Sequence, residues 1–199
     1  LGPFHAWGPD ANSLMRVPGA KSAAAHANRL FLVTHFEYHT EAPALAQGGA
    51  PINLYGNLPM AMNLASLDQD RRDGLLKAAK LSNVDMSGVN GLWIPCAGSL
   101  TPWNTHLGSE EYEPDGRTFE NQPLEAMNLY LGKMGRSASQ GGANAYDYGH
   151  PVEVRVRADG TEKAEKHYAM GRLSLELAEV MPDRRTAYYG DDGRDVAWF

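Results

Sequence analysis

The residues best suited to chemistry lie in one window, from Cys96 to Glu111. This window holds the only cysteine of the 199-residue sequence, then a turn rich in small residues, and ends on the adjacent carboxylates Glu110 and Glu111. Because a lone thiol cannot form an intrachain disulfide, Cys96 is a buried apolar residue, a nucleophile or a metal ligand. The carboxylates favour a ligand, since a thiolate and carboxylates can share one cation cluster. A buried structural cysteine is the alternative.

Acidic residues elsewhere in the chain could join such a cluster. Glu37 stands in an apolar stretch, where a buried carboxylate is costly unless it is paired or bound to a cation. Glu176 lies in an alternating stretch, where an exposed strand face would also explain it. Asp191 and Asp192 precede a glycine, a pattern that is also typical of a β-turn. Five scattered histidines lack the spacing of a zinc site and are interpreted as structural or as supports for ligands: His35, His39, His106, His150 and His167.

The elements that must position these residues are mainly β. Stretches of β-branched, aromatic or alternating residues predict strands over 29–38, 91–95, 152–157, 163–170, 173–180 and 186–189. The stretch 60–67 fits a strand or a helix, and a charged turn is expected over 68–74. One helix is expected over 123–134, with its leucines and methionines in the core. Such short strands fit a sandwich, a barrel or a propeller equally well.

Composition excludes some classes of function. The formal net charge of −6 argues against a nucleic-acid-binding surface, which is normally basic. No apolar run approaches the length of a membrane span. With 43% hydrophobic residues, the chain can bury one substantial core. Its last residues, 196–199, are apolar and predict a further strand.

The Cys96–Glu111 window resembles the signature of the PhoX-type alkaline phosphatases, with Cys-Ala-Gly, then Thr-Pro-Trp, and finally Glu-Glu. Four further segments are similar to family segments in the same order: 32–38, 144–154, 166–176 and 187–192. These enzymes are secreted or periplasmic bacterial phosphomonoesterases built on a β-propeller, with iron and calcium in the active site. The resemblance implies a mainly β fold with few short helices, forming part of a propeller. It also implies that residues 1–199 are one domain, the N-terminal part of a larger β-propeller.

The resemblance implies seven metal ligands: Cys96, Glu111, Glu176, Asp192, Glu110, Glu37 and Asp191. Cys96, Glu111 and Glu176 are expected to bind or bridge iron (Fe3+), while Asp192 and Glu110 are expected beside calcium. Both ions favour carboxylate oxygens. The arginine that binds phosphate in this family is expected beyond residue 199, so no catalytic residue is assigned and the chain alone is expected to be inactive.

Two functions are therefore compared. The first is a PhoX-like phosphomonoesterase, a hydrolase of small phosphate esters in the periplasm or outside the cell. Its partners would be the remaining part of the same protein or other cell-surface chains, with no nucleic acid and no membrane span. The alternative is a non-catalytic secreted propeller, a calcium-stabilised binding or cell-surface assembly module. Leu175, where the family has a histidine, favours the alternative, whereas the intact Cys96–Glu111 window favours the enzyme.

Overall fold

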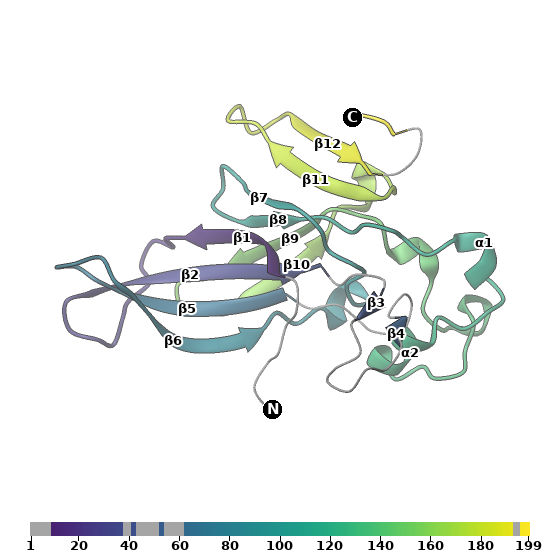
Figure 1. Cartoon of the computed structure of the whole chain (residues 1–199), viewed down its shortest axis with the longest axis horizontal. Helices are drawn as coiled ribbons and strands as arrows, with labels where there is room; N and C mark the ends of the chain where they lie inside the picture. The colour runs from purple at the N-terminus through teal and green to yellow at the C-terminus, as the bar shows by residue number, and fades with distance from the viewer. Residues whose placement is uncertain (1–8, 38–40, 43–51, 54–61, 193–195) are drawn as a thin grey trace.

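The computed structural model describes residues 9–37, 41–42, 52–53, 62–192 and 196–199. Within these residues the chain forms two four-stranded antiparallel sheets and two small two-stranded sheets (Figure 1). The prediction of a mainly β chain with few short helices is therefore confirmed. The described strands do not close into a ring of blades, so the propeller stays a prediction.

The first four-stranded sheet has the order β1-β2-β5-β6: β1 (Pro9–Met15), β2 (Ala27–Phe36), β5 (Met62–Asp70) and β6 (Leu76–Asn83). The predicted strand over 29–38 corresponds to β2, and the ambiguous stretch 60–67 is the strand β5. β5 continues to Asp70, so the predicted turn over 68–74 begins later than expected. The cause is long pairing with β2, which runs from Ala27 opposite Asp70 to His35 opposite Met62.

The second four-stranded sheet has the order β10-β9-β8-β7: β7 (Gly98–Leu100), β8 (His106–Gly108), β9 (Val152–Val156) and β10 (Glu162–Lys166). The predicted strands over 152–157 and 163–170 correspond to β9 and β10, which pair as an antiparallel hairpin. The predicted strand over 163–170 is too long, because a 3₁₀ turn, η4 (Tyr168–Met170), follows β10. There the Met170 N–H donates to the His167 carbonyl and turns the chain away from the sheet.

The remaining strands form two pairs: β3 (Glu41–Ala42) with β4 (Ile52–Asn53), and β11 (Leu175–Val180) with β12 (Ala187–Asp191). The apolar residues 196–199, predicted as a strand, form only an isolated bridge between Trp198 and Gly190 of β12, beside which the Phe199 N–H donates to the Tyr189 carbonyl at 3.0 Å. β7 lies between β1 and β11 and contacts both (Figure 1). This central place of β7 brings three distant parts of the chain together beside Cys96.

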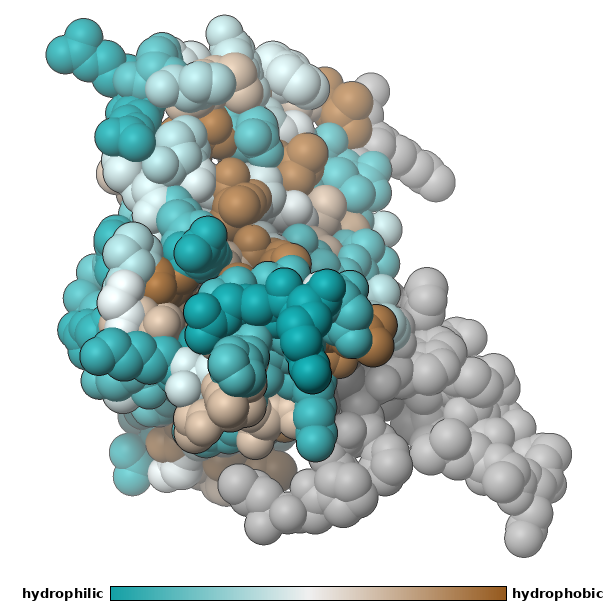
Figure 2. All heavy atoms as spheres, turned by 90° about the vertical axis from the view of Figure 1, so that its left-hand side faces the viewer, coloured by the Kyte–Doolittle hydropathy of each residue, from teal (hydrophilic) through white to brown (hydrophobic). Residues whose placement is uncertain are grey.

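The principal core lies between the two large sheets and includes α2. Its larger members are Met15, Phe31, Val33, Met62, Leu64, Leu92, Trp93, Ile94, Leu124, Met127, Tyr148, Val152 and Val154. Alternation along β1, β2, β5 and β9 sends the core members of these strands inward, namely Met15, Phe31, Val33, Met62, Leu64, Val152 and Val154. The face shown in Figure 2 is covered mainly by hydrophilic side chains, with separate hydrophobic patches between them.

The segment 91–95 is buried but is not a strand, so that prediction is wrong. Its backbone groups find partners outside a strand ladder. The Trp93 N–H donates to the Glu110 carboxylate, and the Ile94 carbonyl accepts from the Glu111 N–H. Apolar residues alone cannot distinguish a buried strand from such an irregular buried segment.

Helical segments are short: α1 (Gly116–Phe119), α2 (Glu125–Leu131), η1 (Ser87–Val89), η2 (Ala138–Gln140) and η3 (Ala145–Asp147). The predicted helix over 123–134 is the shorter α2, which ends because Gly132 takes a left-handed conformation, with φ of 67°. Leu124 and Met127 are buried as expected, but Leu129 and Met134 are exposed. Within the described residues no helix has the length and apolar character needed to cross a membrane.

Candidate metal centre

Three of the predicted ligands converge in the structure. One ligand atom each from Cys96, Glu111 and Glu176 lie within 4.8 Å of one another. The Cys96 thiol donates to Oε2 of Glu176 at 3.2 Å. Cys96 lies just before β7, Glu111 follows β8 and Glu176 belongs to β11. The first two side chains are buried and the third is half-buried, so the group sits at the junction of three segments that are distant in sequence.

A second acidic group shares the same thiol. Asp10, Glu37 and Cys96 also offer ligand atoms within 4.8 Å of one another. Sequence reasoning included Glu37 but missed Asp10. The antiparallel pairing of β1 with β2 sets Pro9 opposite Phe36, which brings Asp10 close to Glu37. No local pattern around Asp10 signals this contact, because it depends on the register of two strands.

The two carboxylates of Asp191 and Asp192 face different neighbours. The Asp192 carboxyl contacts that of Glu111, and its backbone N–H donates to the Ser174 carbonyl at 2.7 Å. Asp191 instead acts on Glu113. The structure therefore brings the carboxyl of Asp192 to Glu111 in the cluster around Cys96, whereas the charge of Asp191 acts on Glu113.

The acidic groups around Cys96 lie close together, and burial together with this proximity raises the pKa of its thiol and of Glu111. Burial, together with the neighbouring Asp192, raises the pKa of Glu111 to about 8. Burial, the hydrogen bond to Glu176 and the charge of Glu111 raise the pKa of the Cys96 thiol. Glu111 Oε2 is buried and has no hydrogen-bond partner in the described part of the chain. No lysine or arginine among the described residues forms an ion pair with Glu111 or Glu176.

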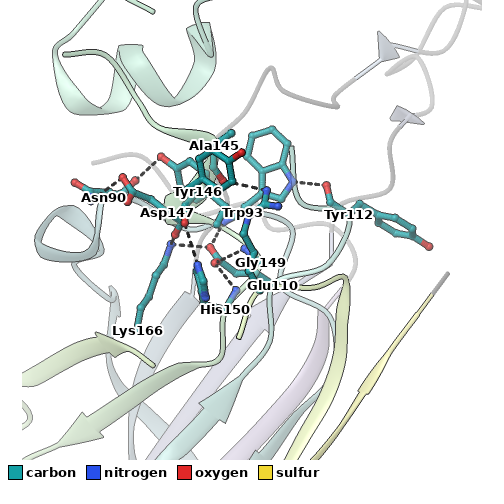
Figure 3. A network of polar contacts seen from close by, with 12 residues as sticks. Asn90, Trp93, Glu110, Tyr112, Ala145, Tyr146, Asp147, Gly149, His150 and Lys166 are labelled. Carbon is teal, nitrogen blue, oxygen red and sulfur yellow. Dashed lines mark hydrogen bonds and ion pairs between the residues drawn. The ribbon is translucent and has the colours of Figure 1, made fainter. Parts of the chain in front are cut away.

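Glu110 is not brought to this cluster, although it precedes Glu111. Its side chain is fully buried and points toward Lys166, Gly149 and His150 (Figure 3). Oε1 accepts from the Trp93 N–H at 2.7 Å and lies 2.9 Å from Nζ of Lys166. Oε2 accepts from the N–H groups of Gly149 and His150 at 3.0 and 3.2 Å. Both oxygens are thus occupied by donors of the protein.

Two of the histidines form a buried pair beside the cluster. The rings of His35 and His106 meet edge to face, with centroids 5.1 Å apart. Burial and the neighbouring ring lower the pKa of His35 to about 3, and burial lowers that of His106 to about 4. His35 Nε2 lies 3.8 Å from Oδ2 of Asp10. The two rings are therefore neutral at neutral pH and lie next to Asp10. His39 lies outside the described residues.

Comparison with known proteins shows similarity to a family and to a curated relative. The family model described as alkaline phosphatase PhoX matches residues 71–199. This span includes Cys96, Glu111 and Glu176 but not Asp10 or Glu37.

The cell pattern formation-associated protein STUA of Colletotrichum gloeosporioides is 28% identical over 145 residues. That alignment covers 63% of this chain and 24% of the relative, so the chain spans about a quarter of the relative's length. No solved structure matches the chain.

Proposed function

The chain belongs to the PhoX alkaline phosphatase family, and on this premise we propose that it carries part of a metal centre that hydrolyses phosphate monoesters outside the cytoplasm. The observation that carries the proposal is the convergence of Cys96, Glu111 and Glu176 within 4.8 Å, around a thiol shared with Asp10 and Glu37. Glu111 is buried beside the half-buried Glu176, and neither forms an ion pair with a lysine or arginine in the described part of the chain. Such a placement is unfavourable unless a cation binds there.

The donor set fits the iron and calcium expected from the family resemblance. Cys96, Glu111 and Glu176 would hold iron, and the unpartnered Oε2 of Glu111 supplies an oxygen that no protein donor uses. Glu37 and Asp192 offer carboxylate oxygens of the kind that calcium prefers. Bound metal ions would neutralise phosphate oxygens and lower the pKa of coordinated water. We leave Glu110 out of this ligand set because both of its oxygens accept from the protein.

The phosphate-binding arginine is proposed to lie outside this chain. Arg172, which is the arginine of the family-like segment 166–176, is engaged elsewhere. Its guanidinium donates to the carbonyls of Pro114 and Ala145 at 2.6 and 3.2 Å. The two four-stranded sheets have the strand number of propeller blades, and we propose that they are blades of a larger propeller that completes the site.

The proposal is tested by elemental analysis for iron and calcium on protein purified natively without chelators. We expect both metals in the wild-type protein and loss of iron in Cys96→Ser. Glu179→Gln, a change on the same strand as Glu176 but outside both acidic groups, is the control and should keep both metals. Hydrolysis of p-nitrophenyl phosphate by the longest natural form of the protein should be lost with the iron. Absence of both metals from the wild-type protein would contradict the proposal.

A second candidate function is a calcium-stabilised binding or cell-surface assembly module. It is favoured by Leu175, a fully buried apolar residue at the position where the family has a histidine. The relative from Colletotrichum gloeosporioides is named for cell pattern formation. Calcium without iron, and no effect of Cys96→Ser on metal content, would support this function over the enzyme.

A further inference from the structure

Glu110 is the centre of a buried network that is separate from the acidic cluster. Its carboxylate accepts three backbone N–H groups, from Trp93, Gly149 and His150 (Figure 3). These donors come from two segments that are more than fifty residues apart in sequence. A carboxylate has enough lone pairs to satisfy all three donors and one cation as well.

Lys166 supplies that cation. Its Nζ lies 2.9 Å from Glu110 Oε1, and both side chains are fully buried. The same Nζ donates to the Asp147 carbonyl at 2.8 Å and lies 4.5 Å from the centre of the Tyr148 ring. Because the charge of Glu110 is balanced inside the protein, its carboxylate has no free oxygen with which to compete for a metal ion.

The backbone around this network leads directly to the three converging ligands. Trp93 lies three residues before Cys96, and Glu110 immediately precedes Glu111. The Glu110 carbonyl accepts from the Leu175 N–H at 2.9 Å, one residue before Glu176. Glu110 therefore fixes the backbone close to each ligand. Its carboxylate holds the Trp93 N–H, three residues before Cys96. Its carbonyl holds the Leu175 N–H next to Glu176, and its own peptide leads to Glu111.

We propose that the Glu110–Lys166 pair is a positioning device that aims Cys96, Glu111 and Glu176 at one point. This inference rests on the proposed metal centre. An apolar pair could fill the same volume but would leave three buried N–H groups without acceptors. Glu110 thus acts through the backbone that it anchors, and not as a ligand, which replaces the calcium role expected from the sequence.

The test measures Co2+ binding by the thiolate-to-cobalt charge-transfer band, which reports on the Cys96 ligand itself. Glu110→Gln is expected to lower Co2+ affinity by about 10- to 100-fold and weaken the band, as loss of groups behind metal ligands usually does. The far-UV circular dichroism should stay that of the wild type. Glu153→Gln is the matched control, since Glu153 is also a buried carboxylate, paired with His167 at 2.9 Å, but it has no link to the cluster.

A second variant keeps the test decisive if Glu110→Gln fails to fold. The double variant Glu110→Gln/Lys166→Met removes both buried charges, so no unpaired ion remains. It should fold and still bind Co2+ more weakly than the Glu153→Gln control. Wild-type affinity and band in a folded Glu110 variant would overturn the inference. Absence of the band in the wild-type protein would instead overturn the proposed metal centre on which the inference rests.

Discussion

The Cys96 thiol donates a hydrogen bond to Glu176 Oε2 across 3.2 Å, joining two residues that are 80 positions apart. The contact links the segment before β7 to the strand β11. It also places the thiol in a field of carboxylates that disfavours its ionisation. The contact therefore couples the reactivity of Cys96 to the charge at Glu176.

Removing that charge should make the metal-free thiol more acidic. In Glu176→Gln the pKa of Cys96 should fall while staying above its ordinary value, because burial is the larger cause of the shift. Since the thiolate is the nucleophile, alkylation by iodoacetamide at pH 8 should be several-fold faster than in the wild type. Glu179→Gln on the same strand should leave the rate unchanged, and an unchanged rate in Glu176→Gln would contradict the prediction.

Glu111 should make the metal-free protein less stable as the pH rises. Its folded-state pKa of about 8 lies above the ordinary value of 4.5. Protonated Glu111 therefore contributes to the free energy of unfolding in full below about pH 4.5. This contribution is lost as the pH rises to about 8. Glu111→Gln should remove this loss, which is at most about 1.4 kcal/mol per pH unit and is reduced by solvent screening.

Urea unfolding of both proteins in chelator at pH 5, 6, 7 and 8 checks this difference in slope. Equal slopes for the wild type and Glu111→Gln would contradict it. Metal binding should lower the raised pKa of Glu111, because metal ligands must be deprotonated. Addition of Co2+ to wild-type protein at pH 7 should therefore release protons, and Glu111→Gln should release fewer.

The buried pair of histidines should make the fold sensitive to acid. The pKa values of His35 and His106, about 3 and about 4, lie below the ordinary 6.5. Their contribution to stability is thus complete above about pH 6.5 and is lost as the pH falls toward these values. In His106→Asn the new amide can keep the contact to Ser13 Oγ, which is 2.8 Å from His106 Nδ1. The slope of stability between pH 6.5 and 4 should fall by about 1.4 kcal/mol per pH unit.

His167→Asn gives the opposite sign and serves as the control. The hydrogen bond to Glu153 raises the pKa of His167. Its contribution is therefore present at low pH and lost as the pH rises through that value, so this variant should be weakened most at acid pH. Urea midpoints at pH 7, 6, 5 and 4 measure both slopes. A His106→Asn slope equal to that of the wild type would show that the pair does not control acid stability.

A side chain at Gly108 should destabilise the fold. An added Cβ would lie 2.8 Å from Met62 Cε, 3.0 Å from His35 Nδ1 and 3.3 Å from His106 Nε2. Gly108→Ala should therefore destabilise the fold by about 1–3 kcal/mol through overpacking. At Gly88 an added Cβ meets nothing within 4 Å, so Gly88→Ala should be neutral or slightly stabilising. Urea unfolding compares the two, and equal stabilities would refute the prediction.

The sequence predicted much of the local structure. β-branched and aromatic residues predicted β2, and the alternation of Val152, Val154 and Val156 predicted β9, because a strand with one buried face repeats every two residues. It failed for 91–95, where buried apolar residues are held by a carboxylate and not by a neighbouring strand. It also overestimated the helical core, since Leu129 and Met134 are exposed.

For the candidate site, the sequence by itself determined which residue types were present and where: one thiol, the pair Glu110–Glu111, and Glu176 in a recognisable segment. Only the tertiary structure decided that Glu111 faces Cys96 while Glu110 faces Lys166. Adjacent residues of an extended chain point to opposite sides. Here Lys166, from the distant strand β10, lies on the side of Glu110 and not on that of Glu111. The same long-range pairing added Asp10 to the cluster, a contact that no local pattern encodes.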